Sequence, residues 1–574
     1  MIVSLIFWVY MTFVVMISGW MFCRLINKVT GYECHDFGVI WLLGLVMVTV
    51  YAQYFSLFSK VGALANVVLV LFCILVLGVE RKKLWEEGKF VFGKLQSVFS
   101  TKKMIIFLLN FFVVLLLFLC VASQKTHHAD TDLYHAQAIR WIEEYGVVKG
   151  LGNLHNRLAY NSSFMCLQAL FSGKFLIDQS THLVNGYIAF VMCSYVLYLL
   201  FSQKKVCCSM LFQISILIYI FDRTTLSLLS SPNTDTLALL LVLFILMKWC
   251  EYLENQEKNI VPYCLLCMIG LFSISVKLTT AMIMILLMRP TVQLIKGKKY
   301  KEIAFFIGIG IAVIAPFLIR NVIISGYLVY PYSSIDLFRV DWKMGKSVVD
   351  YDHKEIMVYA RELCDYNLSN YKMTEWFPIW WNNQSNYIKI LLGANLIMFF
   401  AYIGCLLADI RKKQINWDNI LIFITVSALL LFWFVTAPNV RYGKVFVYGI
   451  PCVVLGNLIK IQKNELVLCL KCFAYAGSIV MLIISVVEYR DEIALKRPAY
   501  YVYRECEETS WEGISMYVAI ENCYCGYYYL PALPYKRTLD FIELRGDTIE
   551  DGFRVREEVK KLTFNNSGVI YKTV

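Results

Sequence analysis

Long apolar runs recur along the whole of the 574-residue chain and constrain its fold more strongly than any motif. Most are close to the roughly 20 residues that an α-helix needs to cross the hydrocarbon core of a membrane. Hydrophobic residues make up 59% of the chain and charged residues 17%, so a soluble fold would expose large apolar patches. The sequence therefore predicts an all-α polytopic membrane protein with about 12–14 transmembrane helices. The runs lie near residues 2–23, 38–58, 62–79, 104–122, 182–201, 206–221, 235–250, 260–276, 278–289, 302–319, 386–408, 417–436, 444–460 and 468–488.

Basic residues collect between alternate runs, and their position indicates the orientation of the chain. Seven Lys and Arg residues fall between Arg81 and Lys103. Further basic turns lie at 204–205, 296–299 and 411–413. Because short loops rich in Lys and Arg stay in the cytoplasm, the other side of the membrane is expected to carry the larger segments. These anchors explain the formal net charge of +12, and no basic arm or finger motif indicates a nucleic-acid partner.

The expected organisation alternates membrane parts with larger external segments. It comprises N-terminal spans at 1–122 with a basic cytoplasmic loop at 80–103, an external loop at 123–181, spans at 182–319, a second external loop at 320–385, spans at 386–488 and a tail at 489–574. From Glu488 onward the tail has 12 basic and 15 acidic residues. This balance fits an extracytoplasmic position, where we expect a small mixed α/β unit.

The first external loop begins with a dense group of ionisable residues, His127-His128-Ala129-Asp130-Thr131-Asp132-Leu133-Tyr134-His135. Ionisable residues at a membrane boundary are functional candidates. Apolar residues then recur at helical spacing as far as Gly146, which predicts an amphipathic helix in the membrane interface. Asp130 and Asp132 stand at its beginning. They could cap the helix, act as a general base toward a hydroxyl, or bind a divalent cation, Mg²⁺ or Mn²⁺; the sequence leaves these roles open.

A polar turn from Gly150 to Ser163 follows, and it contains His155 and Arg157. The planar guanidinium of Arg157 suits a phosphate or sugar ligand, although an arginine at the membrane surface is the alternative. The next stretch, 164–177, is too short and broken to span the membrane. We expect it to form a re-entrant or interfacial helix that closes a cavity.

Three further cations, Lys277, Arg320 and Arg441, stand at the ends of predicted spans. A lysine between two apolar runs is costly unless it reaches water or meets an anion. With the orientation above, all three lie on the outer face, over the loop that carries the carboxylates. They would form a cavity that binds an anionic headgroup.

Taken together, these residues resemble the GT-C type of integral-membrane glycosyltransferase, and more narrowly a bacterial branch of that type. The resemblance runs from about residue 120 to the C-terminus. The chain departs from the family pattern at Asn439, where an acidic residue is favoured, and at Tyr535, where a cysteine is favoured. The matching motifs are Asp130-x-Asp132-Leu133-Tyr134-His135, Asn153-Leu154-His155-x-Arg157, Asn161-Ser162-Ser163, Ser325-Gly326-Tyr327, Ala437-Pro438-x-x-Arg441-Tyr442-Gly443, Leu544-Arg545-Gly546 and Asp551-Gly552-Phe553-Arg554.

The resemblance implies that Asp130 or Asp132 is the catalytic carboxylate. It implies a sugar donor carried on polyprenyl phosphate and a glycan or lipid acceptor, at the outer face of a bacterial cytoplasmic membrane, in the assembly of envelope polysaccharide. The expected substrate-binding residues are His135, His155, Arg157, Lys277, Arg320 and Arg441.

Other functions are compatible with the same residues. A polysaccharide polymerase or ligase would use similar donors but transfer whole glycans. A transporter or flippase for lipid-linked glycans is disfavoured, because the chain shows no internal repeat with paired broken helices. A non-catalytic membrane scaffold is the third alternative. No Gly-rich nucleotide-binding loop is present in the sequence, which argues against direct use of nucleotide sugars.

Overall fold

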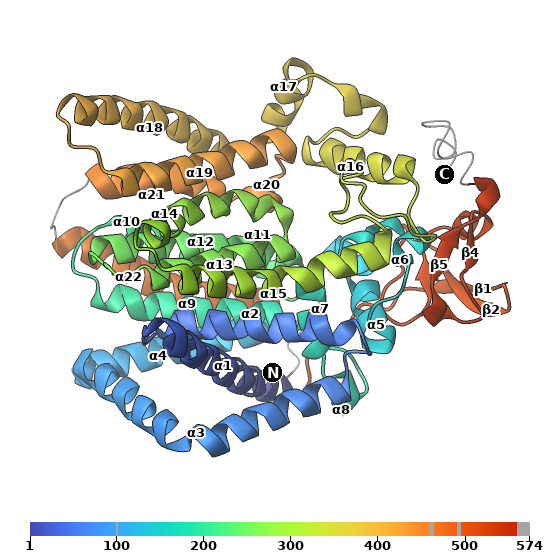
Figure 1. Ribbon diagram of the computed structural model, residues 1–574, viewed down its shortest axis with the longest axis horizontal. Coiled ribbons are helices and arrows are strands. Elements are labelled where there is room, and N and C mark those ends of the chain that lie inside the picture. The colour runs from blue at the N-terminus through green and yellow to red at the C-terminus, as the bar shows by residue number, and fades with distance from the viewer. Residues whose placement is uncertain (99–100, 459–463, 491–494, 560–574) are drawn as a thin grey trace.

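A computed structural model describes residues 1–98, 101–458, 464–490 and 495–559. Figure 1 shows long helices running side by side, with the short helices α5 to α8, α16 and the strands gathered at one end of the bundle. We call this end the loop end. The parts of the predicted segments at 99–100, 459–463, 491–494 and 560–574 lie outside the described residues.

Eleven helical segments among the described residues are long and apolar enough to cross a membrane, so the prediction of an all-α chain with many membrane-length helices is confirmed. They are α1 (Ile2–Thr30), α2 (Phe37–Ser56), α3 (Ala63–Val98), α4 (Thr101–Ala122), α9 (Val184–Ser202), α12 (Thr234–Glu254), η3 with α14 (Leu278–Leu287 and Met288–Lys296), α15 (Tyr300–Ser325), α18 (Asn386–Arg411), α19 (Trp417–Thr436) and α22 (Asn464–Glu488). Three other predicted runs form shorter helices, α10 (Cys208–Phe221), α13 (Val261–Val276) and α21 (Phe446–Leu458).

The two short runs between 260 and 289 form a tight hairpin. α13 ends at Lys277, whose backbone is extended, and the chain returns as the 3₁₀-helix η3 before α14 begins. A 3₁₀ stretch of this length is uncommon and often marks a functional segment. η3 packs between α13 and α19, so the hairpin tip holds Lys277 inside the bundle.

The first two helices pack at very short range because glycines lie where they cross. A Cβ atom on Gly19 would overlap the backbone oxygen of Ile40, and one on Gly44 would overlap the backbone oxygen of Val15. Small residues let membrane helices approach closely. This contact joins α1 to α2, and Ser56 at the end of α2 in turn reaches the loop end.

The predicted interfacial helix is present in the first loop. A single π-helical turn at Thr131–His135 leads into α5 (Ala136–Tyr145), which ends at Gly146 with a positive φ of 77°. The stretch at 164–177 forms two short helices, as expected of a segment that does not span. The other short elements are α6 (Leu151–Leu154), η2 (Asn156–Ala159), α7 (Ser163–Leu170), α8 (Lys174–Ile177), α11 (Arg223–Leu228), α16 (Lys346–Ala360), η4 (Tyr366–Asn370), α17 (Met373–Asn383) and α20 (Val440–Gly443).

The tail forms two small sheets that pack on the first loop. β1 (Cys506–Trp511) and β2 (Ile514–Ala519) are antiparallel, and β3 (Ala532–Leu533) is parallel to β2. β4 (Ile542–Leu544) pairs with β5 (Phe553–Val555), and the 3₁₀ turns η5 (Lys536–Asp540) and η6 (Ile549–Asp551) flank β4. The amide of Phe553 donates to the carbonyl of Lys149 at 2.9 Å. Trp141, Trp511 and Phe553 share a buried cluster that is separate from the core of the bundle, so the tail and the loop form one unit.

The crossing of α1 and α2 leads to a stability prediction. We expect Gly44→Ala to lower the free energy of unfolding by about 1–3 kcal/mol, because the added methyl group must push the two helices apart. The measurement is the unfolding temperature of the purified protein in detergent. Gly78→Ala in α3 is the matched control, since a Cβ there meets no atom within 4 Å. Equal unfolding temperatures for the two variants would contradict the prediction.

Candidate functional site

A cavity of about 480 Å³ lies where the loop end meets the membrane-length helices. Its wall joins the first loop, the α13–η3 tip, α15, α16, α19 and α20. The charged lining residues are Asp130, Arg157, Asp235, Lys277, Glu355 and Arg441. The aromatic lining includes Tyr134, Tyr160, Tyr330, Tyr332, Tyr359 and Tyr442, and the apolar lining includes Ile274, Val276, Leu278, Phe317 and Phe432.

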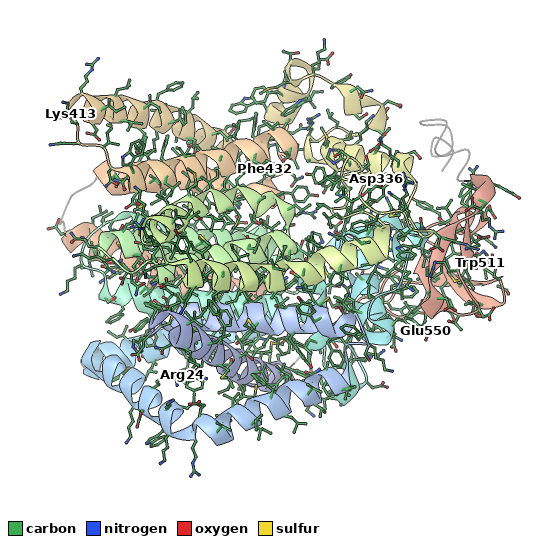
Figure 2. The ribbon with its side chains drawn as sticks, viewed as in Figure 1. Arg24, Asp336, Lys413, Phe432, Trp511 and Glu550 are labelled. Atoms are coloured by element: carbon green, nitrogen blue, oxygen red, sulfur yellow. The ribbon has the colours of Figure 1, made fainter. Side chains whose placement is uncertain are left out.

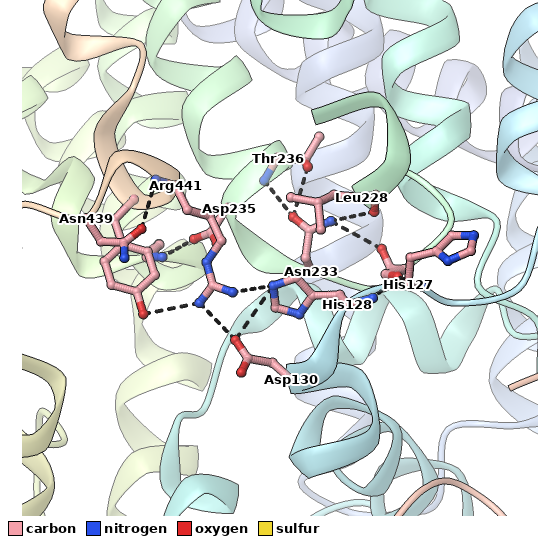
Figure 3. A network of polar contacts seen from close by, with 12 residues as sticks. His127, His128, Asp130, Leu228, Asn233, Asp235, Thr236, Asn439 and Arg441 are labelled. Atoms are coloured by element: carbon pink, nitrogen blue, oxygen red, sulfur yellow. Dashed lines mark hydrogen bonds and ion pairs between the residues drawn. The ribbon is translucent and has the colours of Figure 1, made fainter. Parts of the chain in front are cut away.

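Arg441 is at the centre of the polar network in this cavity (Figure 3). Its Nη2 donates to Oδ2 of Asp130 at 2.9 Å, and its Nε lies 3.2 Å from Oδ2 of Asp235. Its Nη1 contacts Nε2 of His128. A guanidinium can only donate, so Nε2 of His128 is the acceptor and the imidazole is neutral. One side chain therefore joins the first loop, α12 and α20.

Helix caps hold the three segments in place. Asn439 caps α20 by accepting from the amide of Arg441 at 3.0 Å, and Asn233 caps α12 by accepting from the amide of Thr236 at 3.0 Å. Both residue types are strongly preferred at this position. The hydroxyl of Ser231 accepts from the amides of His127 and His128. Asn439 thus serves as a neutral cap.

Lys277 completes the network from the hairpin tip. Its ammonium group contacts Oδ1 of Asp235 and lies 3.9 Å from the ring centroid of Tyr442. Such a position over an aromatic face favours a cation. The carboxylates of Asp130 and Asp235 are therefore balanced by the cations of Arg441 and Lys277.

The surroundings of Asp130 and His135 determine their protonation. Burial opposes ionisation of Asp130, but Arg441 and the two nearby imidazoles outweigh it and lower the pKa of the carboxyl to about 2. Burial lowers the pKa of His128 and brings that of His135 to about 3. The two imidazole rings stack with their centroids 5.7 Å apart. At neutral pH the site holds an ionised Asp130 beside neutral histidines.

Asp132 points away from the cavity. Its Oδ2 accepts from Nε and Nη2 of Arg504 in the tail at 2.9 and 2.6 Å, and it is absent from the cavity lining. Burial raises its pKa in spite of that partner. The π-helical turn that contains Asp132 separates its carboxylate from that of Asp130. The carboxylate that shares Arg441 with Asp130 in the cavity is that of Asp235.

The remaining predicted residues divide into two groups. His135, Arg157, Lys277 and Arg441 line the cavity, whereas His155 and Arg320 do not. His155 is buried outside the lining. The guanidinium of Arg320 is buried and donates to Oδ1 of Asn161 at 3.0 Å and to Oγ of Ser56 at 2.5 Å. Because Asn161 lines the cavity, Arg320 supports the wall from behind.

The arrangement of Asp130 and Asp132 does not suit a binding site for Mg²⁺ or Mn²⁺, which was one of the roles compatible with the sequence. Each carboxylate is paired with a different arginine, and the two face different sides of the π-helical turn. Within the described ranges, no group of three or more His, Cys, Asp and Glu side chains could hold a metal ion.

Several cavity residues were not singled out as binding residues from the sequence. Asp235 follows Ser231-Pro232-Asn233-Thr234, a sequence typical of a helix cap, and Asn233 does cap α12. The useful signal was an acid in the first turn of an apolar span. Glu355 carries no such signal, since a surface helix commonly contains this residue type, and Tyr442 is marked only by its place beside Arg441 in the motif.

The sequence profile of a family described as a domain of unknown function (DUF8201) matches residues 1–448. The chain belongs to this family. The DUF8201 match covers every charged residue of the cavity, from Asp130 to Arg441, and ends before the tail. No curated protein and no solved structure gives a match.

Removal of Arg441 tests the network. Arg441→Met leaves the half-buried carboxylate of Asp130 and the buried one of Asp235 with Lys277 as their cation, and loss of one partner of a buried ion pair costs up to about 3–5 kcal/mol. In the wild type the pKa of Asp130 is depressed to about 2. The stabilisation that ionised Asp130 contributes through Arg441 is therefore complete above about pH 4 and is lost as the pH falls through 2. In Arg441→Met the burial of Asp130 raises the pKa of its carboxyl. The free energy of unfolding of the variant should therefore fall further as the pH rises.

The measurement is the unfolding temperature of both proteins between pH 4 and pH 8. Arg223→Met is the control, because the side chain of Arg223 is 78% exposed and pairs with Glu488 at the surface, where an ion pair contributes little. A stability loss that is equal in the two variants, or that does not change with pH, would contradict the prediction.

Proposed function

We propose that this protein is a GT-C type membrane glycosyltransferase that transfers a sugar from a polyprenyl-phosphate donor to a hydroxyl group of a glycan or lipid acceptor. The observation that carries this proposal is the meeting of two cations, the half-buried carboxylate of Asp130 and an apolar wall in one cavity at the end of membrane-length helices. An amphiphilic phosphate donor needs each of these three environments.

The two halves of such a donor match different parts of the wall. Arg441 and Lys277 offer charge-assisted hydrogen bonds to a phosphate. Ile274, Phe317 and Phe432, from α13, α15 and α19, offer an apolar surface to the first isoprene units. Because a polyprenyl chain remains in the bilayer, the residues that bind its phosphate must lie at the end of the membrane-length helices.

Asp130 is the proposed general base. The acceptor oxygen attacks the anomeric carbon, the bond from that carbon to the phosphate oxygen breaks, the phosphate leaves on its lipid, and Asp130 takes the hydroxyl proton. With its pKa held near 2, Asp130 is a weak base while Arg441 is bound to it. A phosphate that engages Arg441 takes over part of that positive charge and so raises the basicity of Asp130.

We further propose that the loop end faces the outside of a bacterial cytoplasmic membrane. Figure 2 shows Lys413 at the end of the bundle opposite Trp511 and Glu550. Lys413 belongs to the basic turn at 411–413, and basic turns are retained in the cytoplasm. With this orientation the cavity serves the assembly of envelope polysaccharide.

Asp130→Asn is the direct test of the proposed base. The amide cannot take up a proton, so we expect sugar transfer to fall by about 10²–10⁴-fold. Asp132→Asn is the matched control and should lose far less activity, because its carboxylate binds Arg504 outside the cavity lining. The measurement is transfer of labelled sugar from a panel of polyprenyl-phosphate sugars by the protein in proteoliposomes.

Two results would overturn the proposed function. One is full transfer by Asp130→Asn. The other is movement of the lipid-linked sugar across the bilayer by the wild type without cleavage of the sugar–phosphate bond, which would indicate a flippase.

A further inference from the structure

Arg361, the residue that follows α16, is a buried cation without a counter-ion. It is 9% exposed, and its guanidinium carbon lies 4.8 Å from the ring centroid of Trp376 in α17. Its Nε is enclosed and has no hydrogen-bond partner, whereas Nη1 and Nη2 are not enclosed in this way. Within the part of the chain that the structure describes, the guanidinium forms no ion pair and no hydrogen bond. A buried charge is costly unless it is paired, so this position requires an explanation.

The acidic residues that follow Arg361 in the same segment are already engaged elsewhere. Oε1 of Glu362 accepts from Nε2 of Gln384 at 3.0 Å. The side chains of Asp365 and Glu375 accept from backbone amides at the starts of η4 and α17. Burial lowers the pKa of Arg361, and no carboxylate opposes that effect. A negative partner for this guanidinium therefore has to come from outside the chain.

The surroundings of Arg361 place it at the level of lipid headgroups. Trp376 packs on Phe434 in the last turn of α19 (Figure 1), with ring centroids 5.8 Å apart. Trp residues gather where membrane helices meet water. Met373 and Ile379, three residues to either side of Trp376, are exposed. Exposed apolar side chains beside Trp are typical of a helix that lies in the membrane interface.

We infer that Arg361 and Trp376 form a binding site for the phosphate group of an anionic membrane phospholipid. The indole face holds the guanidinium plane from one side. Nη1 and Nη2 can then donate to two oxygens of one phosphate, the geometry for which a planar fork is suited. The acyl chains of this lipid lie along the exposed apolar residues of α17. The site is separate from the cavity around Arg441, since neither Arg361 nor Trp376 is in its lining, and it does not depend on the proposed sugar transfer.

Lipid binding to the full chain tests this site. The delipidated protein in detergent is titrated with phosphatidylglycerol or with diacylglycerol, which lacks the phosphate, and bound lipids are counted by native mass spectrometry. We expect phosphatidylglycerol to bind more tightly, and Arg361→Met to weaken its binding about tenfold because two charge-assisted hydrogen bonds are lost. Lys354→Met is the matched control. It removes the same charge from an exposed position of α16 and should bind like the wild type.

The unfolding temperature separates a binding role of Arg361 from a purely structural one. Phosphatidylglycerol should raise the unfolding temperature of the wild type and of Lys354→Met, because a ligand of the folded state stabilises it. It should raise that of Arg361→Met much less. Arg361→Lys keeps the charge without the planar fork, so it should retain part of the lipid effect, and it replaces the Met variant if that variant does not fold. Wild-type affinity and a wild-type temperature shift in both Arg361 variants would overturn the site.

Two other phosphate compounds distinguish the source of the ligand. An Arg361-dependent shift with inorganic phosphate that equals the shift with phosphatidylglycerol would overturn the assignment to a lipid. Arg361-dependent binding of undecaprenyl phosphate, without such binding of phosphatidylglycerol, would overturn the assignment to a phospholipid and place Arg361 on the route of the proposed donor. Binding of undecaprenyl phosphate that depends on Arg441 but not on Arg361 would support two separate phosphate sites.

Discussion

The guanidinium of Arg441 is the interaction on which the loop end depends. It joins Asp130 of the first loop to Asp235 of α12, two carboxylates that burial would otherwise make costly to ionise. Lys277 at the hairpin tip supplies the second positive charge. Short helix caps at Asn233 and Asn439 fix the backbone on either side. Four segments that are far apart in the chain therefore meet around one balanced group of charges.

This balance connects stability to the proposed chemistry. A phosphate entering the cavity has to share Arg441 with Asp130, and as it does so the carboxylate becomes more basic. The ion pair that stabilises the resting protein would thus keep the base weak until a donor is bound.

The tail contributes to the same site although it lies beyond the family match. Arg504 holds Asp132, and Gln137 of α5 donates to the backbone oxygens of Gly526 and Tyr529. These contacts hold the π-helical turn that presents Asp130. Two acids separated by one residue therefore have different tasks: Asp130 faces the cavity and Asp132 anchors the turn to the tail.

The sequence by itself determined the membrane-length helices, the interfacial helix that ends at Gly146 and most of the cationic lining, because apolar periodicity, caps and charges at helix ends are local signals. Only the tertiary structure decided which charges meet. It paired Asp132 with Arg504, placed Arg320 behind the wall and brought Asp235 to Asp130. Local patterns carry no information on these pairings, because the direction of a side chain depends on the π-helical turn and on how the helices pack.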